Sequence, residues 1–345
     1  MTRLLRIAVL AGLAVVLTAG PAAADPAKPG DYTSTITSVE PPLGHAKVEI
    51  IGGDSFLQVS VDRGHELVVY APGAPDTAHG EAFLRIRADG VVEENQQSGY
   101  TYAIQSRYGA PVPAGLNPSG PPDWKQVGSG GAFAWHDHRI HWMSPTRKPG
   151  IKPGDVVQTW SVQLAVDGTE STVAGVLTLA HPISSFPWFA LALVVAAAGV
   201  LLGRGTSTFV AALVVGLSAA AALYVGAADY RAVPPRAGGT ALVWILPAVA
   251  LVASLVALAL HRKPLGVIGS LLAAACLGGW GLLRIAVLLN PILPTGIPFG
   301  VDRAGTAAAL GAATAAAGLA VRSGGLVPHF ADLVDDDDED DIDDD

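Results

Sequence analysis

The stretch VVQTWSVQLAVDGTESTVAGVLTLAHPISSFPWFALALVVAAAG, residues 156–199, joins two kinds of chain. As far as Leu179, apolar residues alternate with polar ones, which is typical of β-strands with one buried face. From Phe186 onward the residues are almost continuously apolar, as in a helix that crosses a membrane. We therefore expect an all-β region before this junction and an all-α membrane region after it.

Alternation and turn residues predict the β region in more detail. In residues 156–166 every second residue from Trp160 would lie on one face, and the Asp-Gly pair at 167–168 suits a tight hairpin turn because it tolerates positive φ. Short strands separated by Gly, Pro, Asn and Asp favour an immunoglobulin-like antiparallel sandwich, which we place at residues 25–182. Two more strand–turn–strand units are expected at residues 47–61 and 82–94, and a long surface loop at residues 109–122.

The N-terminus has the features of a secretory signal. Arg3 and Arg6 precede a short apolar run, and three alanines, residues 22–24, supply a cleavage site. We predict a signal peptide at residues 1–24, with an uncleaved anchor helix as the alternative. The β domain would then lie outside the cytoplasm. It would contain no disulfide, because the one cysteine, Cys276, falls in an apolar segment.

Five apolar segments follow the β region, and each has roughly the 17–25 residues needed to cross a bilayer. They lie at residues 186–203, 207–228, 240–260, 265–285 and 304–321. The last consists mainly of alanine and glycine, so its apolar driving force is small. An exported β domain makes the first helix run inward and places the basic turn at 261–263 in the cytoplasm. We predict a multi-pass protein of the cell membrane, with its tail in the cytoplasm after five crossings or outside after four.

Composition and charge agree with this class. The chain is 50% hydrophobic and 15% charged, which is too apolar for an ordinary soluble protein. Its net charge of −9 comes from the acidic run at residues 335–345, so the rest lacks the basic face that nucleic-acid binding needs. The tail, residues 322–345, has no periodicity and should be disordered. The expected partners are membrane lipid and another protein of the cell envelope.

The histidine segment, AWHDHRIHWM at residues 134–143, has the residues best suited to chemistry. It contains His136, His138 and His141 among Trp135, Asp137, Arg139 and Trp142. If the segment is a strand, His136 and His138 lie on one face and His141 lies on the other. The first two would suit copper(II), zinc or nickel. A further ligand would have to come from a carboxylate or from another histidine, such as His45, His65 or His79.

A structural role competes with metal binding. Asp137 and Arg139 can form an ion pair, His136 and His141 can donate hydrogen bonds to backbone carbonyls, and the two tryptophans can cover the core. Two histidines without a visible third ligand are a weak metal signal. We therefore favour a metal-free structural role that requires no cofactor, with copper(II) or zinc binding as the alternative.

Catalytic motifs are missing from the sequence. It has no G-x-S-x-G elbow, no H-E-x-x-H helix and no phosphate-binding glycine loop followed by Lys-Ser or Lys-Thr. Ser129, His136 and Asp137 could be combined on paper into a hydrolase triad, but any exported domain of this size would allow such a combination. We predict that the protein is not an enzyme.

Arg284 is the one ionisable residue near the interior of a predicted span. It lies about 19 residues into its segment, or roughly 29 Å at ~1.5 Å per residue, which reaches the outer interface of the membrane. We expect its side chain to extend toward the headgroups, with Asp302 or Asp229 as its partner.

Four pieces of the β region resemble a known group of proteins. The pieces are IGGDSFL (51–57), AFLRIRADGVVEENQQS (82–98), WKQVGSGGAFAWHDHRIHWMSP (124–145) and WSVQLAVDGT (160–169). Together they resemble a group of actinobacterial exported membrane proteins with no assigned biochemical activity, over residues 31–180. The block WHDHRIHWMSP is the most specific part. The resemblance implies one natural domain and implies no catalytic residues.

Two functions follow from these features. The first is a structural or interaction role for a β-sandwich that a multi-pass membrane protein presents outside the cytoplasm. The second is the binding of copper(II) or zinc there by the histidine segment.

Overall fold

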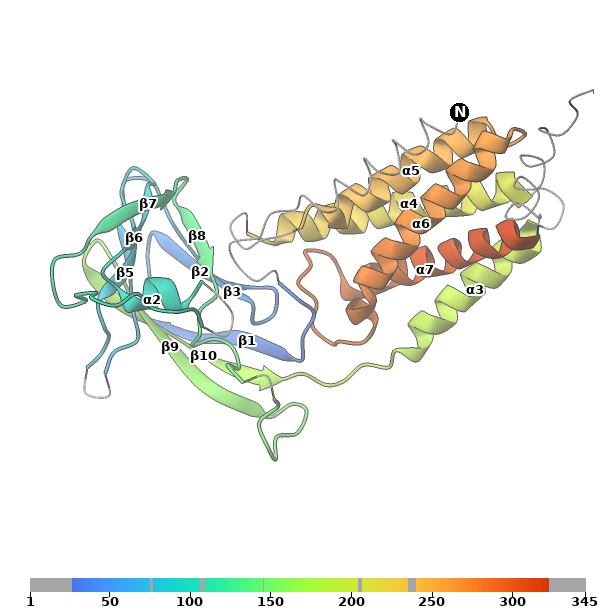
Figure 1. Ribbon diagram of the computed structural model, residues 1–345. Helices are drawn as coiled ribbons and strands as arrows, with labels where there is room; N and C mark the ends of the chain where they lie inside the picture. Colours follow the sequence, from blue (N-terminus) through green and yellow to red (C-terminus); the bar gives the residue numbers. More distant parts are fainter. Residues whose placement is uncertain are drawn as a thin grey trace, which may run out of the picture. The chain divides into compact units, whose positions relative to one another are not determined.

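The computed structural model describes residues 27–74, 77–105, 109–144, 146–203, 207–234 and 240–322 (Figure 1). The predicted signal peptide and the acidic run lie outside the described residues. The chain divides into two compact units. The first contains the β region through Pro182 together with the short stretches 232–240 and 292–294, and the second contains the helices.

The larger sheet of the first unit has seven strands, and each neighbouring pair is antiparallel. In spatial order they are β1 (Tyr32–Glu40), β10 (Thr169–Leu179), β9 (Val156–Val166), β4 (Leu67–Tyr70), β5 (Ala82–Ile86), β6 (Val92–Asn95) and β7 (Trp124–Gly128). The hairpins β5–β6 and β9–β10 confirm two of the predicted units. In the second, Asp167 has a φ of 50° and Gly168 a φ of 78°, and a tight hairpin turn requires both to be positive.

The smaller sheet has three antiparallel strands in the order β2 (Ala46–Ile51), β3 (Phe56–Val61) and β8 (Ala132–Trp135). The hairpin β2–β3 is the third predicted unit. Side chains from both sheets, among them Leu57 of β3 and Leu164 of β9, belong to one hydrophobic core. The N-terminal region is therefore an antiparallel β structure whose two sheets share a core.

The predicted alternation and loop are also present. On β9, Trp160 and Val162 are buried, whereas Thr159 and Ser161 are exposed. Between β6 and β7 the chain forms the short helix α2 (Gly99–Ala103), and the described residues 109–123 contain neither helix nor strand. The Pro- and Gly-rich stretch is thus a loop, as the sequence predicts.

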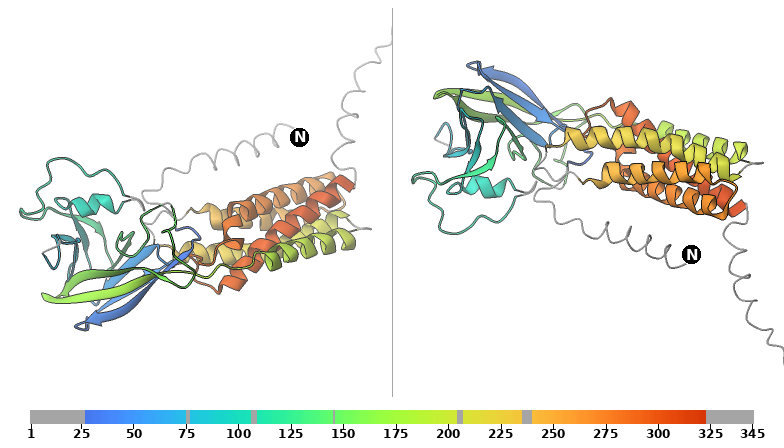
Figure 2. Two further views of the ribbon diagram at one scale, coloured as in Figure 1. Left: turned by 90° about the horizontal axis from the view of Figure 1, so that it is seen from below. Right: turned by 90° about the horizontal axis from the view of Figure 1, so that it is seen from above.

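The second unit is helical. Its described residues form α3 (Phe186–Leu202), α4 (Ser207–Ala232), α5 (Leu242–Ala259), α6 (Pro264–Leu283), the 3-10 helix η1 (Ile285–Leu288) and α7 (Phe299–Arg322). Figure 2 shows the long helices packed side by side. Within the described residues, three of them, α4, α5 and α6, are long and apolar enough to cross a membrane. Helix α3 is apolar but has 17 residues, and α4 extends beyond its predicted end at residue 228.

Helix α7 is the most enclosed helix of this unit. It packs against α3 and α6, and most of its side chains from Asp302 to Ala320 are buried. A Cβ atom added to Gly311 would overlap the main-chain carbonyl of Ala192 in α3. Small residues on α7 therefore allow the close approach of a neighbouring backbone.

Candidate functional site

The histidine segment is the end of a strand followed by a turn. Strand β8 ends at Trp135, and the main-chain N–H of Ile140 donates to the Asp137 carbonyl at 3.1 Å. The strand assumed for residues 134–143 is therefore wrong beyond Trp135. The physical reason is the Asp137 side chain, which accepts a hydrogen bond from the Arg139 N–H at 3.0 Å and so competes with strand pairing.

Asp137 is the centre of the hydrogen bonding in this segment. Its side chain is fully buried, and its carboxylate accepts bonds from three other side chains. Arg139 donates from Nε at 2.8 Å and from Nη2 at 2.6 Å. The hydroxyl of Tyr100 and Nε1 of Trp135 each donate at 2.9 Å. The predicted ion pair between Asp137 and Arg139 is thus a buried, bidentate pair.

Burial and pairing have opposite effects on the ionisation of this cluster. Burial raises the pKa of Asp137, but the charge of Arg139 and the hydrogen bonds to the carboxylate outweigh burial and hold the pKa below its usual value. Burial lowers the pKa of Arg139, but the Asp137 charge outweighs it and raises that pKa. Burial and the charge of Asp137 raise the pKa of Tyr100 well above its usual value. At neutral pH the cluster is therefore a carboxylate, a guanidinium and a neutral phenol.

The same pair is bonded to strands that are distant in the sequence. Arg139 donates from Nη1 to the Tyr70 carbonyl of β4 at 3.0 Å, and its guanidinium lies 5.2 Å from the centre of the Tyr100 ring. Gln158 of β9 donates to the carbonyls of Arg139 at 3.0 Å and His141 at 3.3 Å. The turn therefore holds β4, β9 and the segment around α2 together.

The three histidines lie closer together than a strand would place them. His136 and His141 are both buried, and their ring centres are 6.4 Å apart. The ring of His138 lies 5.6 Å from that of His141. His141, which the strand hypothesis assigns to the opposite face, is thus close to both others. His136 donates from Nδ1 to the Ser55 carbonyl at 2.6 Å, which is the type of bond that the structural interpretation predicts.

The two tryptophans contact the core from different positions. Trp135 is buried, and its ring meets Phe83 edge-on at 5.6 Å between centres. Trp142 is only partly buried against the core, and its Nε1 donates to the Thr146 carbonyl at 2.6 Å. Both rings cover apolar side chains and have a partner for their N–H, as expected of a structural role.

The candidate metal ligands are not arranged as a preformed metal site in the described part of the chain. Across the part of the chain that the structure describes, no group of three or more His, Cys, Asp or Glu side chains is arranged to hold a metal ion. Of the additional histidines, His45 and His65 stack on each other at 3.7 Å, and His79 stacks on Tyr70 at 3.8 Å. Binding of copper(II) or zinc by the histidine segment would require its imidazoles to move.

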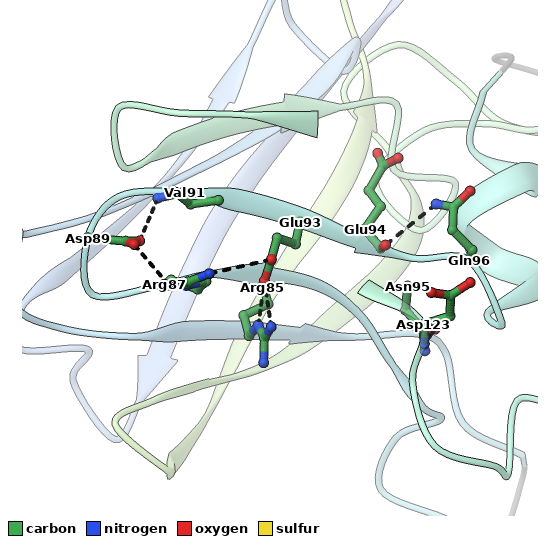
Figure 3. A network of polar contacts seen from close by, with 9 residues as sticks. All are labelled: Arg85, Arg87, Asp89, Val91, Glu93, Glu94, Asn95, Gln96 and Asp123. Atoms are coloured by element: carbon green, nitrogen blue, oxygen red, sulfur yellow. Dashed lines mark hydrogen bonds and ion pairs between the residues drawn. The ribbon is translucent and has the colours of Figure 1, made fainter. Parts of the chain in front are cut away.

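A second polar network follows β5 and β6, and the sequence analysis missed it (Figure 3). Arg85 lies opposite Glu93 and donates to its carboxylate from Nε at 2.9 Å and from Nη2 at 2.5 Å. The Arg85 guanidinium lies 4.5 Å from the centre of the Trp124 ring. The Asn95 side chain donates to one main-chain carbonyl and accepts from two main-chain N–H groups. The Asp-Gly pair signals a hairpin here, but a two-residue turn would place Arg85 opposite Glu94. The hairpin instead has a three-residue connection, with Arg87 bonded to Val91, and this shifts Arg85 opposite Glu93.

Arg284 belongs to the second unit, at the C-terminal end of α6. Its guanidinium forms ion pairs with both predicted partners, Asp229 of α4 and, at 2.5 Å, Asp302 of α7. Only 10% of the Arg284 side chain is exposed. The position of Arg284 in the sequence predicts that this side chain extends outward to the headgroups, and that prediction is wrong. Two carboxylates bind the guanidinium inside the bundle instead.

No family model matches the chain, and no curated protein or solved structure matches it. A function must therefore be inferred from the contacts within each of the two units.

Proposed function

We propose that this is a multi-pass membrane protein that presents an extracytoplasmic β-sandwich with a structural or interaction role in the cell envelope, without catalysis. One observation carries the proposal. The most distinctive polar residue of the sequence, Asp137, is a fully buried carboxylate whose hydrogen bonds join a turn to the core. A buried carboxylate that already accepts hydrogen bonds from several side chains is better suited to positioning loops than to reacting with a substrate.

The proposed topology has five spans with the β domain outside. Three helices support it by length and composition. Helix α7 supports it by burial, because a helix enclosed by other helices does not need large apolar side chains to face lipid. Reporter fusions beside Trp160 and after residue 322 test it: the first should be active only outside, and the second only in the cytoplasm.

We also propose that the β domain is immunoglobulin-like. Two antiparallel sheets with a shared core support this class. The strands are divided seven and three, which differs from the four and three of the simplest such domains. An experimental structure of the domain, compared with immunoglobulin domains by strand connectivity, tests the assignment.

A double change in the histidine segment tests the structural role. The variant with His136→Ala and His138→Ala should have a lower melting temperature, because His136 loses its bond to Ser55 and both rings leave gaps. Copper(II) or zinc should leave the melting temperature of the unchanged protein the same. A rise with either metal would contradict the metal-free proposal.

Metal binding remains the second proposal, and one observation favours it. The turn gathers three imidazoles, with ring centres 5.6 and 6.4 Å apart, and imidazole nitrogens suit copper(II) and zinc. Calorimetry on the full-length protein in detergent should then show uptake of one metal ion, which the double alanine variant abolishes. No uptake by the unchanged protein would dispose of this proposal.

A further inference from the structure

The end of the helix bundle where α4 and α6 finish and α7 begins contains a buried cluster of charged side chains. Arg284 and Arg303 are its cations, and Asp229 and Asp302 are its carboxylates. The sequences of α3, α5 and η1 contain no charged residue. Arg231, close to Asp229 along α4, is exposed. The four named groups are thus the charges that face one another among these packed helices.

Arg284 has a partner on every side of its guanidinium. One terminal nitrogen pairs with Oδ2 of Asp229, and the other pairs with Oδ1 of Asp302. Its Nε donates to the Thr306 hydroxyl at 3.5 Å, and its carbon lies 4.9 Å from the centre of the Trp280 ring. Two carboxylates therefore share one cation, which can fully compensate only one of them.

Arg303 does not compensate the second carboxylate through a direct ion pair. Its Nε donates to the Val287 carbonyl at 3.2 Å, and its Nη2 donates to the carbonyls of Asn290 and Pro291 at 2.9 and 3.0 Å. Main-chain carbonyls of the α6–α7 connection thus surround this guanidinium. Its charge therefore stabilises that connection. Arg284 is the cation that forms ion pairs with both carboxylates.

Asp229 is the member of the cluster with an unused acceptor. Among the residues that the structure describes, its Oδ1 has no partner at hydrogen-bond distance, although the Thr295 hydroxyl lies close to the same carboxylate. The residue is only 8% exposed. An ionised oxygen without a donor is costly inside a protein, and acidic residues inside membrane bundles commonly exchange protons. We propose that Asp229 is a proton-binding site, where a proton from solvent is held on Oδ1 while Asp302 keeps its contact with Arg284.

The proposal links the acidity of the solution to a contact between helices. A proton on Asp229 removes the charge that attracts Arg284 toward α4, but it leaves the pair between Arg284 of α6 and Asp302 of α7 in place. Release of the proton restores the second ion pair. Asp229 would thus strengthen the contact between α4 and α6 as the pH rises.

Infrared difference spectroscopy on the full-length protein in lipid nanodiscs tests the proposal, because a protonated carboxyl has its own carbonyl stretch. The unchanged protein should show this band at a pH where a solvated aspartate, with a pKa of ~3.9, is ionised, and should lose it in alkali. The variant Asp229→Asn should lack the band. The variant Asp89→Asn, which changes an exposed carboxylate, should keep it.

A third variant keeps the test decisive where Asp229→Asn does not fold. In Asp302→Asn the Arg284 charge has only Asp229 to pair with, so the band should move to lower pH or vanish. A band that stays in Asp229→Asn, or that does not move in Asp302→Asn, would assign the proton elsewhere and overturn the proposal. The absence of any band from the unchanged protein would mean an ionised Asp229 with water on Oδ1, and would overturn it equally.

Discussion

At the scale of single residues, Asp137 is a charge held in the core by its neighbours. The sequence predicts its pairing with Arg139, because the two residues are close together along the chain. It does not predict Tyr100 or Gln158 as members of the same network. These residues are far apart in the sequence, and only the register of the sheets brings them together. Local pairs can thus be read from the chain, but contacts that depend on tertiary packing cannot.

Replacement of Asp137 by asparagine should strongly destabilise the β domain. It leaves the buried Arg139 without a counter-charge, and breaking a buried ion pair in this way costs ~3–5 kcal/mol. Thermal unfolding of the full-length protein in detergent, followed by tryptophan fluorescence, measures the effect. Lys47→Ala is the control, because it breaks a pair with Glu49 whose side chains are 68% and 43% exposed and should cost at most ~1 kcal/mol. Equal losses in the two variants would contradict the role given to Asp137.

Acid should weaken the β domain through the same residue. The folded protein holds the pKa of Asp137 below its usual value, so the stabilisation is present above the unfolded pKa of ~3.9 and is lost as the pH falls through the folded pKa. The melting temperature of the unchanged protein should therefore fall more steeply below about pH 4 than that of Asp137→Asn. Parallel curves for the two proteins would show that other carboxylates cause the acid sensitivity.

At the scale of elements, alternation and turn chemistry predict the hairpins well, because a strand with one buried face needs a period of two. The same reasoning fails at residues 136–143. There the Asp137 side chain accepts a hydrogen bond from the main-chain N–H of Arg139 and ends the strand. The alternation of polar and apolar residues carries no information about such a bond. The helix bounds follow the apolar segments closely, but composition alone does not show that α7 is enclosed by α3 and α6.

Two glycines of α7 should respond differently to replacement by alanine. Gly311→Ala places a Cβ against the Ala192 carbonyl, and overpacking of this kind typically costs ~1–3 kcal/mol. Gly300→Ala has no atom within 4 Å of the new Cβ, and alanine favours a helix, so stability should stay the same or rise. Thermal unfolding of the full-length protein in detergent, followed by the helical signal in circular dichroism, measures the change in stability caused by each replacement. A loss of stability in Gly300→Ala as large as that in Gly311→Ala would show that the α3–α7 contact is not the cause.

At the scale of the whole molecule, the exposed apolar side chains of the helices suit contact with lipid. Leu193 of α3, Leu217 of α4 and Val252 of α5 are each more than half exposed, which is costly in water. We expect the full-length protein to stay in the membrane fraction after an alkaline carbonate wash. A chain that ends at Pro182 should be released by the same wash if residues 1–24 are a cleaved signal peptide. It should stay in the membrane fraction if they are an uncleaved anchor helix.

If α7 crosses the membrane as proposed, its alanine and glycine residues make the order of helix assembly important during biosynthesis. A segment with so few large apolar side chains has little tendency of its own to leave the insertion machinery for the bilayer. It would be taken up by a groove that the earlier helices have already formed, with close backbone contacts such as the one at Gly311 replacing hydrophobicity. Errors in the packing of the earlier helices would then leave α7 exposed to water, where cellular quality control can recognise the protein and degrade it.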